Sequence, residues 1–314
     1  MDKIKNKSIL LIGGTGFIGA NLARRLSKLN VNLDVLYKGY AKNIKKLNLG
    51  KNIRLVEGDI TNYKSVEENV KGKDVIINLA AVKNQDSNFN PFIDLDINCR
   101  GQLNVLEARK DVNPNSKYIF LGTRVQFGNV KEKDLPVPED YCQKPISLYG
   151  IHKQTCENYC SLYKRAFNLN SVVLRASIVY GNWLSDENSS MIDKFVKKAL
   201  KNERFYVNGY GKDMKDLIYI DDLIDLIIKV IESDVDEGAY NVGSGEKIRL
   251  IDIAKKIVNL CGSGSFEAVP FPKETERFEL GSFYFDISKV KKEFKWKPKT
   301  SIDSGLKKMI VEYK

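Results

Sequence analysis

Tyr149 and Lys153 are the residues of this chain whose types and spacing most directly offer chemistry. They stand four residues apart in a helix-like segment, so their side chains would share one face of a helix. An ammonium group beside a phenol stabilises the phenolate and lowers the tyrosine pKa from about 10 toward neutrality. Such a tyrosine can exchange a proton with a carbinol or carbonyl oxygen. The spacing alone is common by chance, so its meaning depends on the rest of the chain.

A glycine-rich turn near the amino terminus supports the catalytic interpretation. The segment Gly13-Gly14-Thr15-Gly16-Phe17-Ile18-Gly19 follows an apolar strand-like run and opens a helix-like run. Glycines allow a tight turn and a close approach of the backbone to a pyrophosphate, whose charge the helix amino terminus faces. This position predicts a dinucleotide site, in preference to a purely structural turn. The expected cofactor contacts in the turn are Gly13, Gly16, Phe17, Ile18 and Gly19.

Thr123 ends another apolar run, which begins at Tyr118. Ligands bind at the carboxyl ends of strands in an open parallel sheet, so Thr123 is predicted to hydrogen-bond the reacting oxygen. The alternative is a strand-end residue that caps a turn. His152 is the single histidine of the chain and is expected to be a packing or surface residue. One histidine leaves no pair for a zinc hydrolase.

The end of the second strand-like run bears on the choice between NAD and NADP. NAD sites carry an acid about 20 residues after the glycine turn, where it holds the ribose hydroxyls. Here the run ends with Tyr37 and Lys38, and Asp34 lies mid-strand, where a structural role is favoured over a ribose contact. Without the acid a ribose phosphate is not repelled, and Lys38 could pair with it. NADP is therefore predicted, with NAD possible.

The pattern around these residues predicts an α/β fold. Short β-branched runs alternate with amphipathic ones, as expected for parallel strands joined by crossover helices. The expected strands are 8–12, 33–37, 53–57, 75–79, 118–122 and 172–175, and the expected helices are 17–29, 63–70, 91–111, 147–166, 191–200, 221–233, 250–260 and 301–313. This order is typical of a Rossmann-type doubly wound parallel sheet, with a smaller C-terminal α/β substrate-binding domain.

The domain division is predicted from the same pattern. Residues 1–180 would form the dinucleotide-binding Rossmann domain, and a segment of about 215–243 would return to it. Residues 181–214 and 244–314 would form the substrate-binding part.

Composition limits the class of protein. The chain has 314 residues, 43% of them hydrophobic, and a net charge of +11 from scattered basic residues without a nucleic-acid motif. No apolar stretch approaches the roughly 18 to 20 residues of a membrane span, and no signal-peptide core precedes the first strand. The five cysteines are odd in number and lack metal-ligand spacing. We expect a soluble cytoplasmic protein with reduced thiols, no metal, and no nucleic-acid or membrane partner.

Taken together, these residues resemble the extended short-chain dehydrogenase/reductase family, the NAD(P)-dependent epimerases, dehydratases and reductases of nucleotide-activated sugars. The resemblance covers nearly the whole chain. The segments that carry it are Gly13 to Gly19, Gly58 to Ile60, Asn78 to Ala81, Asn98 to Gly101, Thr123 to Gly128, Tyr149 to Lys153, Leu174 to Gly181, Asp216 to Asp222 and Tyr240 to Gly243.

The resemblance implies a role for each matching residue. Thr123, Tyr149 and Lys153 are the implied catalytic residues, and Tyr149 and Lys153 also contact the cofactor, Lys153 through the nicotinamide ribose. Asp59 and Ile60 are implied adenine contacts, and Ala80 and Ala81 the cofactor-lining end of the fourth strand. The implied substrate-binding residues are Arg124, Asn182, which would face the sugar nucleotide, Lys215, and Arg277, which would reach the diphosphate.

Departures from the family pattern narrow the activity. Dehydratases of this family follow the catalytic threonine with Asp-Glu, whereas Arg124 and Val125 stand here. Without those carboxylates 4,6-dehydration is not expected, and the related decarboxylases keep a glutamate where this chain has Val125. Lys215 replaces a common arginine and cannot clamp a phosphate through two hydrogen bonds as arginine can.

The resemblance therefore implies an oxidoreductase acting at carbon 4 of a nucleotide-activated hexose. NADPH-dependent reduction of a nucleotide-linked 4-keto-6-deoxy sugar is favoured, because an epimerase gains from every contact that retains its cofactor and this chain lacks the ribose acid. The alternatives are an NAD-dependent 4-epimerase and a non-catalytic NADP-binding protein. The family also implies a homodimer, built from the helices that carry Asn98 to Ala108 and Ser147 to Ala166.

Overall fold

The computed structural model describes residues 3–39, 52–82, 90–182 and 190–314. The chain folds into two compact units. Unit 1 comprises Met1–Gln126, Gln143–Arg175 and Ile224–Tyr240, and unit 2 comprises Phe127–Cys142, Ala176–Leu223 and Asn241–Lys314. A helix with the length and apolarity needed to cross a bilayer is absent from the described residues.

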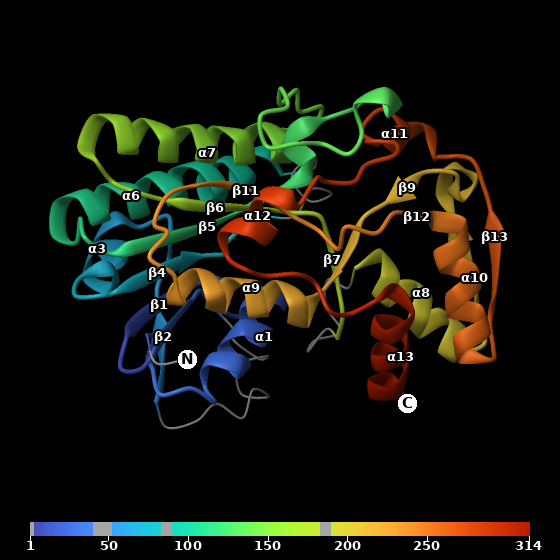
Figure 1. Cartoon of the computed structure of the whole chain (residues 1–314), viewed down its shortest axis with the longest axis horizontal. Helices are drawn as coiled ribbons and strands as arrows, with labels where there is room; N and C mark the ends of the chain where they lie inside the picture. The colour runs from blue at the N-terminus through green and yellow to red at the C-terminus, as the bar shows by residue number, and fades with distance from the viewer. Residues whose placement is uncertain (1–2, 40–51, 83–89, 183–189) are drawn as a thin grey trace. The chain divides into compact units, whose positions relative to one another are not determined.

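A seven-stranded sheet forms the centre of unit 1 (Figure 1). Its order is β11 (Gly238–Val242), β6 (Val172–Ala176), β5 (Lys117–Thr123), β4 (Val75–Asn78), β1 (Ser8–Ile12), β2 (Asn32–Tyr37) and β3 (Ile53–Glu57). Strand β1 pairs in parallel with both β2 and β4, so the chain order reverses there. Ligands bind at the carboxyl ends of the strands around such a reversal. The predicted doubly wound α/β fold is confirmed.

Helices on both faces explain why the central strands read as continuous apolar runs. Figure 1 shows α3 (Tyr63–Val70), α6 (Gly101–Val112) and α7 (Leu148–Phe167) on one face, and α1 (Phe17–Leu26) and α9 (Ile220–Glu232) on the other. All four residues of β4 are buried, as are the last four of β1. A parallel strand enclosed in this way carries no polar alternation.

The helix predicted over residues 91–111 is a composite. It consists of α5 (Pro91–Asp94), a π-helix η1 (Leu95–Arg100) and α6. A π-helical turn widens the helix by one residue and often marks a functional site. All three parts of this composite helix, α5, η1 and α6, contact α7.

Helix α7 begins and ends where its sequence dictates. The Ser147 hydroxyl accepts a hydrogen bond from the Gly150 N–H and so caps the amino terminus. Asn168 ends the helix in the left-handed conformation, at φ 55°. The predicted bounds of 147–166 are therefore correct to within a residue.

Within the described residues, unit 2 has three two-stranded sheets and a group of helices. Its elements are η2 (Arg124–Phe127, of which Phe127 belongs to this unit), η3 (Glu132–Asp134), β7 (Ile178–Tyr180), α8 (Met191–Leu200), β8 (Arg204–Val207), η4 (Asn208–Gly211), β9 (Met214–Lys215), β10 (Leu217–Tyr219), β12 (Ile248–Arg249), α10 (Leu250–Cys261), β13 (Ser265–Ala268), α11 (Lys273–Glu276), α12 (Ser288–Glu293) and α13 (Ile302–Tyr313). Strand β7 pairs with β10, β9 with β12, and β8 with β13. Helix α10 packs against both α8 and α13. None of these strands was predicted from the sequence, because each is too short to show a periodicity.

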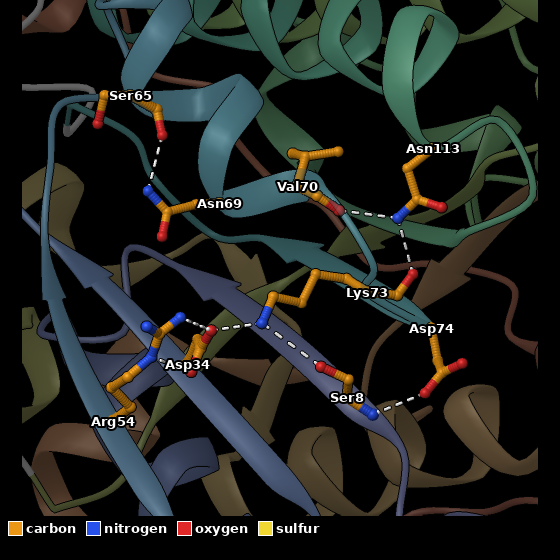
Figure 2. A network of polar contacts seen from close by, with 9 residues as sticks. All are labelled: Ser8, Asp34, Arg54, Ser65, Asn69, Val70, Lys73, Asp74 and Asn113. Carbon is orange, nitrogen blue, oxygen red and sulfur yellow. Dashed lines mark hydrogen bonds and ion pairs between the residues drawn. The ribbon is translucent and has the colours of Figure 1, made fainter.

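A polar network near the amino-terminal ends of β1 and β4 shows the role of Asp34 (Figure 2). Its carboxylate accepts hydrogen bonds from Arg54 Nε, at 3.0 Å, and from Lys73 Nζ. Lys73 also reaches Ser8 Oγ at 3.4 Å, and the Ser8 N–H donates to Asp74 Oδ2 at 2.7 Å. The structural interpretation of Asp34 is therefore the correct one.

Asp34→Asn should destabilise the fold by about 1 to 3 kcal/mol at pH 7, because it removes a partner of two cations. Burial disfavours the charge of Asp34, but hydrogen bonds from Arg54 and Lys73 outweigh burial and lower its pKa. This stabilisation is complete above the unfolded-state pKa of about 4 and is lost as the pH falls through the lower folded-state pKa.

Urea unfolding from pH 7 down to pH 2 measures the effect. The free energies of unfolding of the wild type and of Asp34→Asn should converge as the pH falls. Asp252→Asn, which removes an exposed partner of Arg249, serves as the control and should cost less than 1 kcal/mol, roughly the limit for exposed pairs. A gap between wild type and Asp34→Asn that stays constant with pH would contradict the assignment.

Candidate active site

The glycine turn between β1 and α1 shows two different reasons for its glycines. Gly13 has φ +77°, and a Cβ there would lie 2.6 Å from the Ala80 backbone nitrogen. A Cβ on Gly19 would lie 2.3 Å from the Gly13 carbonyl oxygen. A Cβ on Gly16 would meet the chain only at 3.5 Å, which is ordinary contact. The fold itself therefore requires Gly13 and Gly19, whereas the space at Gly16 suits a bound group.

The amino terminus of α1 has the character of an anion site. In this helix, which the structure describes throughout, Gly16 is the N-cap without a side-chain hydrogen bond, and the first turn holds no acid. The first turn of α1 thus presents the positive end of the helix dipole with no acidic side chain of its own to offset it. This feature and the open space at Gly16 fit the pyrophosphate of a dinucleotide.

The expected adenine end of the cofactor site contains an ion pair that the sequence did not predict. Lys38 Nζ lies 2.5 Å from Asp59 Oδ2, although most of the Lys38 side chain is exposed. Burial opposes the charge of Asp59, yet its bonds with Lys38 and Thr61 prevail and lower the pKa of that carboxyl. Lys38 was predicted as a phosphate contact and Asp59 as an adenine contact; in the structure they are partners.

The neighbouring residues predicted to contact the cofactor are held by hydrogen bonds and by packing. Asn104 Nδ2 donates to the Ile60 carbonyl oxygen at 2.8 Å, and Gly101 gives the Ile60 side chain its space. The Ala80 N–H donates to Asn78 Oδ1 at 3.1 Å. Since Gly13 packs on Ala80, the glycine turn and the end of β4 lie together, as expected for one site.

The three predicted catalytic residues come together at the carboxyl end of β5. A Cβ on Gly150 would lie 2.7 Å from the Val125 carbonyl oxygen, so Gly150 allows α7 to approach the residues that follow Thr123. Tyr149 directly precedes Gly150 on α7, so it lies at the same end of β5. The Thr123 oxygen itself accepts from the Val125 N–H at 3.3 Å, which leaves the hydroxyl proton for donation.

Lys153 is almost fully enclosed on the next turn of α7. Only 3% of the residue is exposed, and its ammonium lies 4.1 Å from the centroid of the Phe120 ring. An ammonium over an aromatic face is attracted by the electron-rich ring. Burial nevertheless lowers the pKa of Lys153 to about 8.

The prediction that a neighbouring ammonium lowers the Tyr149 pKa is wrong for the chain by itself. Desolvation raises the pKa of Tyr149, the charge of Asp94 raises it further, and the Thr123 hydrogen bond offsets only part of the rise. The phenol is therefore protonated at neutral pH and ready to donate.

A buried network that sequence reasoning missed holds the end of β5. The Thr123 N–H donates to Gln126 Oε1 at 2.8 Å, and Gln126 Nε2 donates to Glu157 Oε2 at 2.8 Å. The same Glu157 oxygen accepts from Arg175 Nε at 3.0 Å. The network thus ties β5, α7 and β6 together. One signal was present: Glu157 lies four residues after Lys153, so it extends the Tyr149 face of the helix.

The predicted substrate residues occupy different surroundings. Arg124 is half-buried and begins η2. Asn182 and Lys215 are buried, and Lys215 Nζ donates to the Gly281 carbonyl oxygen at 2.9 Å. Arg277 is exposed and stacks its guanidinium 4.9 Å from the Phe278 ring centroid. Their contacts to a substrate remain predictions.

Two further expectations concern cysteines and metals. All five cysteines, each within the described residues, have free thiols. In the part of the chain that the structure describes, no three acidic, cysteine or histidine side chains gather as metal ligands.

Comparisons with known proteins place this chain among its relatives. It is similar to a putative UDP-glucose 4-epimerase of Methanocaldococcus jannaschii, 29% identical over 309 residues, 96% of this chain and 97% of that one. It is also similar to the CDP-paratose 2-epimerase of Salmonella typhi, 28% identical over 333 residues, 96% of this chain and 97% of that one.

A solved structure and a family model agree with these relatives. The UDP-glucose 4-epimerase of Thermotoga maritima, determined with UDP-glucose, has a TM-score of 0.86 and 27% identity, over 98% of each chain. The model of the NAD dependent epimerase/dehydratase family matches residues 9–243. With its glycine turn, its Thr-Tyr-Lys group and a match across most of its length, the chain belongs to the NAD-dependent epimerase/dehydratase family of enzymes, within the extended short-chain dehydrogenases/reductases.

Proposed function

We propose that this enzyme is an NAD(P)-dependent epimerase that acts at carbon 4 of a nucleotide-linked hexose. The observation that carries the proposal is the Thr123, Tyr149 and Lys153 group at the end of β5, where Arg124 and Val125 follow the threonine. This group can move a proton on and off an oxygen. Neither residue after Thr123 supplies the acid or base that an elimination would need.

Each residue has a definite task in this chemistry. Oxidation of a carbinol takes a proton from the oxygen and a hydride from the carbon, and a bound nicotinamide supplies the hydride acceptor. In the oxidation Tyr149, as the phenolate, would take the proton and become the phenol, and in the re-reduction the phenol would return it. Thr123 is proposed to hydrogen-bond the reacting oxygen, and Lys153 to contact the nicotinamide ribose. The same groups would act in reverse in the re-reduction, which gives the epimer when the keto sugar presents its opposite face to the hydride donor.

Reduction of a nucleotide-linked 4-keto-6-deoxy sugar with NADPH is the second candidate. Tyr37 and Lys38 in place of a ribose acid favour it, since they suit a cofactor that carries a 2′-phosphate and leaves after each turnover. The two relatives reported above carry epimerase names, one for carbon 4 and one for carbon 2. For that reason we place epimerisation first, in reverse of the order that the sequence favoured.

The cofactor preference is a separate proposal. Membership of the family supports a nicotinamide dinucleotide in general. We propose NADP over NAD, with Lys38 leaving Asp59 to pair with the ribose phosphate. Asp59 lies beside Lys38 and competes with the ribose phosphate for its ammonium group. The preference for NADP therefore depends on which of the two anions Lys38 pairs with.

Residues 181–214 and 244–314 are proposed as the substrate-binding part. The proposed contacts of the nucleotide-linked sugar are Arg124, Asn182, Lys215 and Arg277. A homodimer is proposed through the helices that carry Asn98 to Ala108 and Ser147 to Ala166, which are the composite helix of α5, η1 and α6, and α7. Phe92 is 78% exposed on α5, and Ile151, Leu162 and Phe167 are each more than 40% exposed on α7. Exposed apolar side chains on these helices would be buried by a second copy of the chain. The native molecular mass in solution tests the dimer.

Incubation with a panel of nucleotide-linked hexoses, without added cofactor, tests the function. We expect conversion to the carbon-4 epimer with no net change in NADPH absorbance. Tyr149→Phe should reduce the rate roughly 100-fold or more, because it removes the proton donor and keeps the ring. Tyr159→Phe, on the same helix, is the matched control and should keep wild-type activity. Stoichiometric NADPH oxidation by a 4-keto-6-deoxy substrate, without epimerisation, would favour the reductase instead.

Lys38→Glu should weaken NADP binding about 5- to 150-fold, the value of one charged phosphate contact. NAD binding should change little, so the preference should partly reverse. Isothermal titration of both cofactors measures it, with Lys28→Glu, at the exposed end of the α1 segment, as the control. Equal affinities of the wild type for the two cofactors would show that Lys38 stays with Asp59.

A further inference from the structure

Gln126 is a buried amide in the short helix η2 that follows β5. None of its surface is exposed, whereas Thr123, three residues earlier, is half-buried. A side chain enclosed in this way does not reach a substrate, so any part that Gln126 plays in the chemistry acts through a neighbour. Burying an amide is costly unless its donor and its acceptor are both used.

The two ends of this amide have different neighbours. The oxygen of Gln126 accepts from the Thr123 N–H at 2.8 Å. The nitrogen donates to Glu157 Oε2 at 2.8 Å and to Gln143 Oε1 at 3.3 Å. The reversed orientation would set the NH₂ group against an N–H and the oxygen against a carboxylate. The neighbours therefore fix the amide in one orientation.

Gly122 leaves the space that this arrangement needs. A Cβ on Gly122 would lie 2.9 Å from Gln126 Oε1 and 3.3 Å from Arg175 Cγ. Gly122 does not have a positive φ, so the reason for a glycine here is space and not conformation. The residue before Thr123 thus lacks a side chain where the amide of Gln126 packs.

Glu157 supplies the acceptor that the amide nitrogen requires. Its Oε2 also accepts from Arg175 Nε at 3.0 Å, and its Oε1 accepts from Gln143 Nε2 at 3.3 Å. Glu157 lies on α7, the helix that also carries Tyr149. Gln126 therefore joins the backbone of Thr123 to the helix of Tyr149 through two hydrogen bonds.

We propose that Gln126 is a positioning residue of the active site, whose amide fixes the backbone of Thr123 relative to the helix that carries Tyr149. The inference deepens the proposed function and rests on it for the task of Thr123. Gln126 touches no reacting atom and acts only through the place that it gives to the threonine hydroxyl. A glutamine suits this task because one end of its side chain accepts and the other donates.

Gln126→Leu should lower kcat about 10- to 100-fold and change KM less than about threefold, because a small displacement of a catalytic group costs rate more than binding. Gln143→Leu is the matched control. Gln143 hydrogen-bonds Gln126 and Glu157, and no hydrogen bond between described residues joins it to Thr123. It should keep kcat within about threefold of the wild type. Equal losses of kcat in the two variants would overturn the positioning role.

Gln126→Glu tests the same role through pH. A protonated carboxyl keeps the shape of the amide, accepts from the Thr123 N–H and donates to Glu157. Burial and the charge of Glu157 raise the pKa of the new carboxyl, and Arg175, the nearby cation, is already paired with Glu157. The ratio of variant to wild-type kcat should approach one at low pH and fall about 10-fold or more as the carboxyl ionises. A ratio that stays constant with pH would overturn the proposal.

A backbone measurement separates this inference from the proposed activity. In protein labelled with ¹⁵N-threonine, the Thr123 amide signal is identified by its loss in Thr123→Ser. Its hydrogen exchange should be about 10-fold faster or more in Gln126→Leu than in the wild type. If Gln126→Leu does not fold, Gln126→Glu at high pH replaces it. Unchanged exchange would overturn the proposal. If the enzyme turns over none of the hexoses, the proposed function fails, while the exchange still decides whether Gln126 holds Thr123.

Discussion

The ion pair between Glu157 and Arg175 is the interaction on which the geometry of the active site depends. It joins the catalytic helix to β6 in the interior, and the same carboxylate receives Gln126, which in turn holds the backbone of Thr123. Buried charges of this kind are held by mutual attraction and by further hydrogen bonds, and the loss of one partner leaves an uncompensated charge that costs about 3 to 5 kcal/mol. The position of Thr123 therefore depends on the buried contacts among Gln126, Glu157 and Arg175.

Helix α7 carries several of the residues that shape the candidate active site. Ser147 starts the helix, Gly150 lets it approach the end of β5, and Tyr149, Lys153 and Glu157 follow at intervals of one turn. Two of the proposed catalytic residues and Glu157, which anchors them to β6, thus share one helix. A proton donor held on a helix keeps its geometry better than one on a loop. The cost is a row of polar groups in an apolar interior, each of which needs a partner.

The sequence was sufficient for the parts of the molecule that repeat a strong pattern. The apolar runs of β1 and β4 and the glycine turn predicted the sheet and its ligand edge, because burial on both faces leaves a continuous signal. Gln126, Glu157 and Asp94 were missed, because a buried polar residue looks like a surface residue until its partner is known. The Lys38 contact with Asp59 was missed for the same reason, since it needs the register of β2 on β3.

Because the chain returns to unit 1 after part of unit 2, one strand of the central sheet can join only after the others have been synthesised. Strand β11, at the edge of the sheet beside β6, is made only after residues 176–223 of unit 2 have left the ribosome. Six strands can assemble early, but β6 then waits with an open edge, which is a surface prone to mispairing. The edge of β6 stays unpaired until β11 has been synthesised. About 65 residues are translated between the end of β6 and the end of β11. During that time the edge can pair with the wrong strand.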